Sequence, residues 1–348
     1  MSETASNQRI QTNGTPVTIL TGFLGAGKTT LLNHILSNQD GLKTAVLVNE
    51  FGEIGIDNDL VVSTSADMVE LSNGCICCTI NGELLEAVDR ILKRPEPLDY
   101  LVVETTGLAD PLPVAMTFLG SELRDQTRLD SIITLVDAEN CNARVFESEV
   151  GRSQIIYGDI LLLNKTDLVS TERVKELEES LRSIKKDARI LHSVKGDVPL
   201  PLLMSVGLFE SDRVATKAEH DHHGHAHHDH DHHDHGQAHH DHADHLDIEG
   251  YTSLSFSSDG PFSLRKFQNF LDNQLPESVF RAKGILWFNE SEKRHVFHLA
   301  GKRFSIDDSD WDGERKNQLV LIGQEMDHSN LREQLKACVA KDADRSLS

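Results

Sequence analysis

Eight consecutive residues near the amino terminus, Gly22–Thr29, read Gly-Phe-Leu-Gly-Ala-Gly-Lys-Thr. Glycines allow successive backbone N–H groups to converge on phosphate oxygens, and a helix that begins directly afterwards adds its positive dipole end. In such a loop the lysine reaches the terminal phosphates of a nucleotide and the threonine binds Mg²⁺. The pattern therefore predicts a nucleotide site whose residues are Gly22, Phe23, Leu24, Gly25, Ala26, Gly27, Lys28, Thr29 and Thr30.

A carboxylate is expected to complete the magnesium site. The apolar run Leu101–Val103 ends in Glu104, and Gly107 follows shortly afterwards. Because ligands bind at the carboxyl ends of parallel strands, we expect Glu104 to contact Mg²⁺ through water and to form the catalytic group with Lys28 and Thr29. Gly107 would let the backbone approach the γ-phosphate. Without the phosphate loop, the same Glu would be interpreted as a carboxylate near the start of a helix.

The base is predicted from Asn164-Lys165-Thr166-Asp167, which follows the apolar run Ile160–Leu163. The Asp167 carboxylate can accept both the N1–H and the N2 amino hydrogen of guanine, whereas adenine offers no such pair of donors. The stem of Lys165 can lie along the base plane, and Asn164 can hold the loop together. The sequence therefore favours GTP over ATP, although in isolation these residues also fit an ordinary strand-to-helix turn with a capping Asp.

Three thiols, Cys75, Cys77 and Cys78, lie between the phosphate loop and Glu104. Thiolates are soft ligands that suit Zn²⁺ or Cu⁺ far better than Mg²⁺, and a tetrahedral ion needs one further ligand. Water, Glu50, a histidine or a target protein could supply it. The alternatives are that some of the thiols are buried as small apolar groups, or that neighbours form a disulfide switch.

Residues 220–245 form a second candidate metal-binding segment, because 14 of these 26 residues are His and six are Asp. Neutral imidazole suits Zn²⁺, Ni²⁺, Co²⁺ and Cu²⁺. A flexible tract of this kind should bind several ions weakly, since ordering the chain around each ion costs conformational entropy. The alternative interpretation is a solvated linker whose histidines are incidental.

Length and charge exclude several classes of protein. A chain of 348 residues exceeds the roughly 250 residues at which a single core stops growing, so we expect two domains. Its formal net charge of -22 argues against binding to nucleic acid or anionic membranes. No apolar stretch approaches the roughly 20 residues that span a bilayer, and the polar, disordered residues 1–15 lack the apolar core of a secretory signal. We therefore expect a cytoplasmic protein, in which the isolated Cys141 and Cys338 are packing residues.

Residues 16–207 alternate short apolar runs with helical stretches, which is typical of a parallel sheet with helices on both faces. The expected fold is therefore the α/β fold of a P-loop NTPase. Strands are predicted at Val17–Leu20, Thr44–Val48, Tyr100–Val103, Ile132–Val136, Ile160–Leu163 and Arg189–Leu191, and helices after Lys28, over Gly82–Leu92 and over Thr171–Ser183.

After a flexible His-rich linker at residues 208–248, residues 249–348 are expected to form a small α+β domain. Its predicted strands are Tyr251–Phe256, Gly284–Phe288, Arg294–Leu299, Arg303–Ile306 and Gln318–Ile322, and its predicted helices are Phe262–Leu271 and Ser329–Val339. We expect this domain to mediate association with a client or with a second copy of the chain.

Five segments, GFLGAGKTT, VNEFGEIGID, NGCICCTI, ETTGLADP and NKTD, together resemble the CobW family of metal-chaperone GTPases, relatives of the GTPases that insert nickel into hydrogenase and urease. The resemblance covers most of the chain, and Gly-Cys-x-Cys-Cys is its most specific part. It implies that Cys75, Cys77 and Cys78 bind a transferred metal. It also implies that Cys78–Gly82 lies close to the nucleotide and that GTP hydrolysis drives delivery to a client enzyme. Some relatives carry an acidic residue where Val48 stands, so the resemblance does not supply the fourth ligand.

The expected function is thus a metallochaperone that hydrolyses GTP to GDP and phosphate and delivers Zn²⁺ to a client metalloenzyme. Zn²⁺ is preferred because thiolate-rich tetrahedral coordination suits it. The alternatives are delivery of Co²⁺ for cobalamin synthesis, and a metal buffer without catalytic activity. A small-molecule kinase is disfavoured by the guanine motif, as we call the segment Asn164–Asp167. A homodimer is compatible with the sequence, and slow hydrolysis is expected because no arginine finger can be identified.

Overall fold

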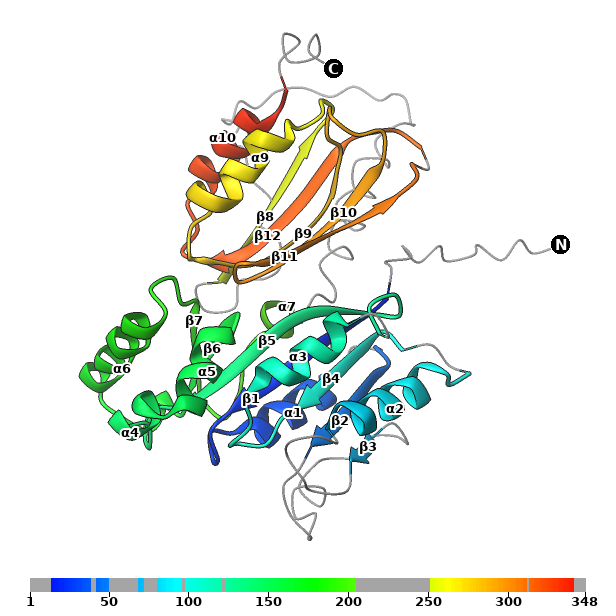
Figure 1. Cartoon of the computed structure of the whole chain (residues 1–348). Helices are drawn as coiled ribbons and strands as arrows, with labels where there is room; N and C mark the ends of the chain where they lie inside the picture. The colour runs from blue at the N-terminus through cyan, green and yellow to red at the C-terminus, as the bar shows by residue number, and fades with distance from the viewer. Residues whose placement is uncertain are drawn as a thin grey trace, which may run out of the picture.

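The computed structural model describes residues 14–38, 42–49, 68–71, 80–95, 98–120, 123–204, 251–311 and 313–340. Within these ranges an amino-terminal domain, drawn in blue to green, and a carboxyl-terminal domain, drawn in yellow to red, are stacked on each other (Figure 1). Glu50, the cysteines Cys75, Cys77 and Cys78, and the His-rich tract lie outside the described residues. No helix of the described residues is both long and apolar enough to cross a membrane.

The described part of the amino-terminal domain contains a parallel sheet with the strand order β3-β2-β4-β1-β5-β6-β7. Its strands are β1 Thr15–Gly22, β2 Thr44–Asn49, β3 Met68–Leu71, β4 Tyr100–Glu104, β5 Thr127–Asp137, β6 Ile160–Asn164 and β7 Ile190–Ser193. The predicted strands are all present, and β3 is an addition at the edge. It was missed because Met-Val-Glu-Leu is short and includes a charged residue, so it lacks the continuous apolar run of a doubly buried strand.

Helices cover both faces of this sheet. They are α1 Lys28–Ser37, α2 Ile80–Leu92, α3 Pro111–Leu119, α4 Ala143–Glu147, α5 Glu149–Tyr157, α6 Thr171–Ile184 and α7 Leu200–Leu203. In β1, Val17 and Ile19 pack in one apolar cluster with α2 and α3, whereas Leu20 packs in another with α1 and α7. Burial on both faces explains why this strand is rich in apolar residues, with the buried Thr18 as the one polar residue between Val17 and Leu20.

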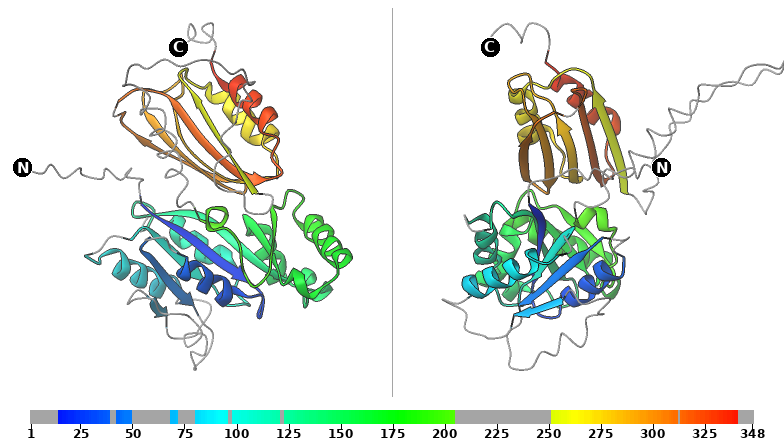
Figure 2. Two further views of the ribbon diagram at one scale, coloured as in Figure 1. Left: turned by 180° about the vertical axis from the view of Figure 1, so that it is seen from behind. Right: turned by 90° about the vertical axis from the view of Figure 1, so that its right-hand side faces the viewer.

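The carboxyl-terminal domain is an antiparallel sheet in the order β11-β10-β9-β12-β8, with α9 and α10 on one face (Figure 2). Its elements are β8 Tyr251–Ser258, α9 Leu264–Asn269 with a π-helical turn at Phe270–Gln274, β9 Val279–Leu286, β10 Arg294–Ala300, β11 Arg303–Ser309, β12 Asn317–Gln324 and α10 His328–Cys338. The predicted start of the second strand, Gly284, was wrong, because β9 already begins at Val279. Arg281 and Lys283 interrupt its apolar pattern, and Arg281 is buried against the other domain rather than in the core of its own.

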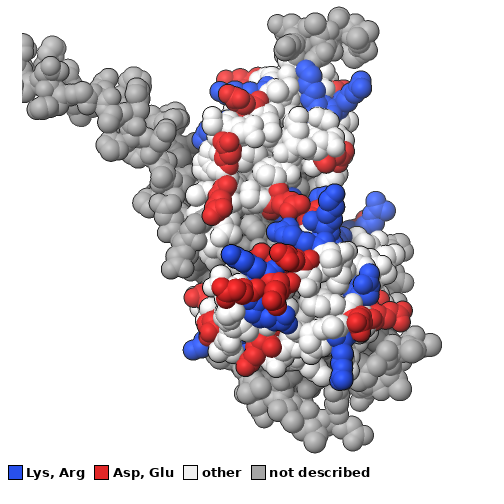
Figure 3. All heavy atoms as spheres, turned by 90° about the vertical axis from the view of Figure 1, so that its left-hand side faces the viewer, with Lys and Arg blue, Asp and Glu red and all other residues white. Residues whose placement is uncertain are grey.

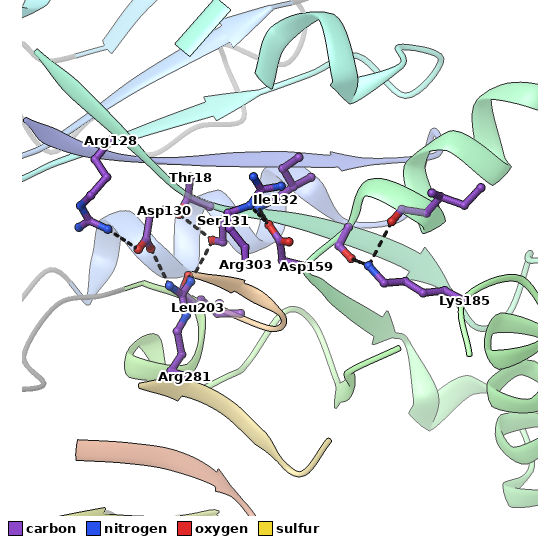
Figure 4. A network of polar contacts seen from close by, with 12 residues as sticks. Thr18, Arg128, Asp130, Ser131, Ile132, Asp159, Lys185, Leu203, Arg281 and Arg303 are labelled. Carbon is purple, nitrogen blue, oxygen red and sulfur yellow. Dashed lines mark hydrogen bonds and ion pairs between the residues drawn. The ribbon is translucent and has the colours of Figure 1, made fainter. Parts of the chain in front are cut away.

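A buried ion pair joins the two domains. Arg281 is fully buried, and its Nη1 lies 2.6 Å from Oδ2 of Asp130 in β5. The same guanidinium donates to Ser131 Oγ at 2.9 Å and to the Leu203 carbonyl oxygen (Figure 4). Apolar residues of both domains share one cluster around this contact, including Leu202, Leu203, Phe280, Val320 and Ile322.

Further ion pairs cross the junction nearer the surface. On one side of the molecule, acidic and basic side chains intermingle where the two domains meet (Figure 3). The pairs between the domains include Arg182–Glu277 at 2.8 Å, Lys302–Asp187 at 2.5 Å and Arg303–Asp159 at 2.7 Å.

Candidate nucleotide site

The sheet brings three of the predicted segments to one edge. Strand pairing places Leu20 beside Glu104 and Asp137 beside Asn164, so the carboxyl ends of β1, β4, β5 and β6 lie together. The phosphate loop, the Glu104 turn and the Asn164–Asp167 segment all follow these ends directly. This is the edge at which open parallel sheets bind ligands.

The phosphate loop has the backbone conformation that its glycines predict. Gly25 and Gly27 have φ of 76° and 100°, in the left-handed region that favours glycine. Gly27 is the N-cap of α1 and offers no side chain to the helix amino end, so this end can receive an anion instead. The Lys28 side chain is only 8 % exposed, and its Nζ donates to the carbonyls of Gly22 and Phe23 at 2.9 and 3.2 Å. The ammonium is therefore held against the loop.

The turn after β4 packs directly on this loop. Glu104 is buried, and the next residue, Thr105, donates its N–H to the Leu20 carbonyl at 2.9 Å and its hydroxyl to Thr21 Oγ1 at 2.9 Å. A Cβ on Gly107 would lie 2.5 Å from the backbone nitrogen of Leu24, so the absence of a side chain is required by the loop itself. The turn and the phosphate loop thus form one unit.

The side chains at this junction suit a hard cation. Thr29 and Glu104 offer a hydroxyl and a carboxylate, and neighbouring Thr106 has a buried hydroxyl without a hydrogen-bond partner. Mg²⁺ prefers such oxygen ligands and keeps several waters, which an unpartnered hydroxyl can accept or donate to. The residues present therefore fit Mg²⁺ bound beside a nucleotide. Thr106 was not predicted from the sequence to contribute to the site.

Asn164 connects three loops at the base end of the site. Its Nδ2 donates to the Ala26 carbonyl at 3.0 Å, and its Oδ1 accepts from Ser193 Oγ and from the Gly196 N–H, each at 3.0 Å. The expectation that Asn164 holds the loop together is confirmed. The turn at Ser193–Gly196 was not predicted to contribute. Asp167 is exposed in the 3₁₀ turn Thr166–Leu168, so its carboxylate is accessible to a base.

Asp137, the last residue of β5, is a further residue of the site that the sequence analysis missed. Its Oδ2 lies 2.7 Å from Nζ of Lys165, whose backbone is left-handed at φ 63°. Asn140 donates to the same carboxylate through its backbone and its side chain. Burial alone would raise the pKa of Asp137, but the hydrogen bonds from Lys165 and Asn140 hold it below its ordinary value. The carboxylate is thus ionised and orients Lys165.

The predicted thiol site at Cys75, Cys77 and Cys78 lies outside the residues that the structure describes. Among the residues described, no group of three or more His, Cys, Asp and Glu side chains could hold a metal ion. Cys141 and Cys338 are buried and not in disulfides, as expected of packing residues. Burial raises the pKa of each thiol to about 11, so neither is a reactive thiolate at neutral pH.

Two family models match the chain. Residues 16–192 match the nucleotide-binding domain described as CobW/HypB/UreG, and residues 251–339 match the cobalamin synthesis protein CobW carboxyl-terminal domain. The chain belongs to the CobW family. It is therefore a GTPase with a P-loop fold, as the phosphate loop and the guanine motif predicted, and it hydrolyses GTP to GDP and phosphate.

Named relatives of this CobW-family GTPase match along most of its length. The zinc chaperone YjiA of Escherichia coli is 34 % identical, over 92 % of this chain and 97 % of the relative. The zinc chaperone CobW of Pseudomonas aeruginosa is 32 % identical over 93 % and 92 %, and the zinc-regulated GTPase metalloprotein activator 1 of Dictyostelium discoideum is 30 % identical over 95 % and 81 %. A crystal structure of Zn(II)-bound YjiA from E. coli is 29 % identical, covers 94 % of this chain and all of that one, and has a TM-score of 0.45.

Proposed function

We propose that this CobW-family GTPase is a cytoplasmic metallochaperone, which binds Zn²⁺ through Cys75, Cys77 and Cys78 and transfers it to a client metalloprotein when GTP is hydrolysed. The names of the relatives, two zinc chaperones and a zinc-regulated metalloprotein activator, support the metal and the transfer. Zn²⁺ is the cargo in this proposal, and the thiolates that hold it match its preference for tetrahedral sulfur coordination.

The observation that carries the proposal is the position of the two elements that flank the cysteines in the chain, β3 before them and α2 after them. β3 ends at Leu71, which pairs with Asn49 at the end of β2, and Val48 pairs in turn with Glu104. The chain therefore enters the cysteine segment at the same sheet edge that holds the Glu104 turn. It returns in α2, which begins at Ile80. Eight residues between these two points, residues 72–79, supply all three clustered thiols, which supports a metal site next to the nucleotide.

In this proposal the nucleotide is bound by the residues that meet at the sheet edge. The loop Gly22–Thr30 would hold the phosphates, and Asp167 would bind guanine while Lys165 lies along it. Lys28 and Thr29 would act with Glu104 in hydrolysis, and Thr29 and Glu104 would hold Mg²⁺. When bound, Mg²⁺ would neutralise charge that develops on the phosphates. Glu50, which follows β2 directly, is our candidate for a fourth ligand to Zn²⁺.

Metal affinity in the two nucleotide states tests this function. We expect Zn²⁺ to bind at least about tenfold more tightly with a non-hydrolysable GTP analogue than with GDP, because a transfer driven by hydrolysis needs a metal affinity that differs between these states. By linkage, Zn²⁺ must then tighten binding of the analogue by the same factor. Competition with a zinc-binding dye and nucleotide fluorescence measure the two factors. Equal metal affinities would contradict the proposal and favour a buffer of metal ions.

Serine substitutions identify the ligands. Replacing Cys75, Cys77 and Cys78 together should abolish the tight Zn²⁺ site and its dependence on nucleotide. The matched control replaces the buried Cys141 and Cys338, and should leave the affinity unchanged. Weak residual binding to the triple variant is expected from the histidines of residues 220–245, which we propose to capture metal reversibly. The same titration with Co²⁺ tests the alternative cargo.

A further inference from the structure

A cleft of about 720 Å³ lies between the two domains. One wall is formed by the end of α3 and the start of β5, with Leu119, Arg124 and Arg128. The other wall is β11, with Arg303, Phe304 and Asp307. The cleft opens at the first residues of β5, whereas the nucleotide site lies at the last, so the two are at opposite edges of the parallel sheet. Nothing in GTP binding uses this cleft.

The inner side of the cleft carries an excess of positive charge. The Arg128 side chain is only 8 % exposed, and its Nη1 lies 3.3 Å from Oδ1 of Asp130. Asp130 is shared with Arg281, whose Nη1 is 2.6 Å from Oδ2 (Figure 4). Lys283 and Asp307 are close enough to interact electrostatically with Arg128. The charged residues that line the cleft are three arginines, Arg124, Arg128 and Arg303, and two aspartates, Asp125 and Asp307, in a chain whose formal net charge is -22.

Several buried polar atoms here have no hydrogen-bond partner. They are Nε of Arg128, Oδ2 of Asp307 and both ring nitrogens of His298, which is on β10. Burial, followed by the charges of Arg128 and Lys283, lowers the pKa of His298 to about 2. Burial and the charge of Arg128 also lower the pKa of Lys283 to about 8. Burial is the main cause of both shifts, and the neighbouring cations add to it.

Apolar side chains line both walls at the mouth of the cleft. Leu119 is 50 % exposed and Phe304 is 40 % exposed, on α3 and β11 respectively. Met116, one turn earlier on α3, is also exposed. Large apolar side chains that face each other across an open cleft are typical of protein contact sites, particularly where arginines lie beside them.

We propose that this cleft is a docking site for an acidic segment of a partner protein, in which a carboxylate meets Arg124 and Arg128 and an adjacent apolar side chain packs between Leu119 and Phe304. A segment is favoured over a folded surface because the cleft is recessed between the domains. Acidic charge is favoured because the cleft is cationic while the chain as a whole is acidic. Identifying this partner with the metal client would rest on the proposed function, but the docking site itself does not.

An array of random twelve-residue peptides, probed with the full-length GDP-bound protein, tests the proposal. We expect the bound peptides to be enriched in Asp and Glu next to Leu or Phe. The best peptide, labelled with fluorescein, then gives affinities by anisotropy, and its counterpart with Asn and Gln in place of the acids should bind at least about tenfold more weakly. No acidic enrichment, or equal binding of the two peptides, would overturn the proposal. So would displacement of the peptide by an RNA oligonucleotide or by inorganic phosphate at equal concentration.

Exposed residues at the rim allow substitutions with opposite effects. Arg124→Glu should weaken binding of the acidic peptide by about fivefold or more, and Asp125→Asn should tighten it, because each changes the charge at the mouth in an opposite sense. Phe304→Ser should weaken binding of both peptides, the acidic one and its Asn and Gln counterpart, to the same extent.

Arg265→Glu, an exposed charge reversal on α9 that does not line the cleft, is the matched control. GTP hydrolysis should be unchanged in all four variants, so failure here leaves the proposed function intact. If Arg265→Glu had the same effect as Arg124→Glu, the site would not be this cleft.

Discussion

Asp137 shows how one carboxylate can orient Lys165, which we propose lies along the base. Lys165 adopts a left-handed backbone, which costs a residue other than glycine roughly 1–2 kcal/mol. The ion pair of 2.7 Å to Asp137 and the 3₁₀ turn that follows hold it there. In the binding mode that we propose, the stem of Lys165 is thereby fixed before guanine arrives, so less conformational entropy would be lost on binding.

Asp137→Asn is therefore expected to weaken binding of both GTP and GDP by about tenfold, since the ion pair to Lys165 is lost and the base contact is common to both nucleotides. Titration with a fluorescent guanine nucleotide measures the effect. Glu139→Gln, which neutralises an exposed carboxylate two residues away, is the control and should be silent. Unchanged affinity in Asp137→Asn would show that Lys165 is oriented by other contacts.

His298 makes stability depend on pH. It is buried, and it faces Arg128 and Asp130 from β5 and Arg281 and Lys283 from β9. Its pKa falls from 6.5 to about 2 on folding, so the unfolded chain binds a proton below pH 6.5 that the folded chain does not. The stabilising contribution is complete above pH 6.5 and is lost as the pH falls, by about 1.4 kcal/mol per pH unit.

His298→Phe should remove this dependence. Between pH 7.0 and pH 5.5 the free energy of unfolding should fall less in the variant than in the wild type, by roughly 1.4 kcal/mol for a full unit below the unfolded pKa. Urea unfolding at the two pH values gives the difference. Phe297→Leu, a buried substitution on the same strand that removes no titratable group, should leave the slope unchanged. Parallel slopes for His298→Phe and the wild type would mean that His298 takes up a proton in the folded state.

At the scale of elements, the sequence predicts best what is buried on both faces. Strands such as β6, with Ile-Leu-Leu-Leu followed by Asn164, are continuous apolar runs because helices cover both sides. The edge strand β3 and the start of β9 lack that signal, since one is short and the other places Arg281 in an interface between domains. Residues in an interface between domains are buried by residues far away in the chain, and the local pattern of apolar residues cannot predict such contacts.

The candidate site follows the same rule. Glu104 and Asn164 were found because each is a polar residue that ends a strand, directly after buried apolar residues. Asp137 ends β5 in the same way but belongs to no familiar motif. The signal for Asp137 was therefore present in the sequence. The contribution of the Ser193–Gly196 turn could not be predicted, because it consists of hydrogen bonds to Asn164 from 29 and 32 residues away.

The turn from β1 to α1 gives a prediction at this scale. Gly25 and Gly27 both have positive φ, but a Cβ on Gly25 meets open space whereas one on Gly27 would collide with Nδ2 of Asn164. Gly27→Ala should thus reduce nucleotide affinity at least about tenfold more than Gly25→Ala does. Both variants carry backbone strain of about 1 kcal/mol from the positive φ, but only Gly27→Ala breaks the contact of the loop with Asn164. Nucleotide titration of the two variants decides the comparison. Equal losses would assign the whole effect to backbone strain.

For the molecule as a whole, the pair Arg281–Asp130 connects the carboxyl-terminal domain to the centre of the parallel sheet. Asp130 also accepts a hydrogen bond from the Tyr100 hydroxyl, which is itself 2.9 Å from Thr18 Oγ1. The contacts that begin at Arg281 thus reach three adjacent strands, β5, β4 and β1, through Asp130 and Tyr100. The opposite ends of these strands carry Asp137, Glu104 and the phosphate loop. The domain interface and the nucleotide site share the same strands.

Breaking this pair should cost far more stability than breaking a pair at the surface. Arg281→Met removes the 2.6 Å ion pair from the buried Asp130, and we expect a loss of about 3 kcal/mol in the free energy of unfolding. Arg182→Met removes an interdomain pair whose side chains are 40 % and 50 % exposed, and should cost less than about 1 kcal/mol. Urea unfolding of the full chain measures both.

The double variant Asp130→Asn with Arg281→Met separates the cost of an unpaired charge from the value of the contact. Because the buried carboxylate is gone, the double variant should regain at least half of the stability that Arg281→Met loses. If it is no more stable than the single variant, the hydrogen bonds from Arg281 to Ser131 and to the Leu203 carbonyl carry the interface. If Arg281→Met instead costs no more than Arg182→Met, the two domains are held together mainly by the apolar cluster around Phe280 and Ile322 and by the ion pairs nearer the surface.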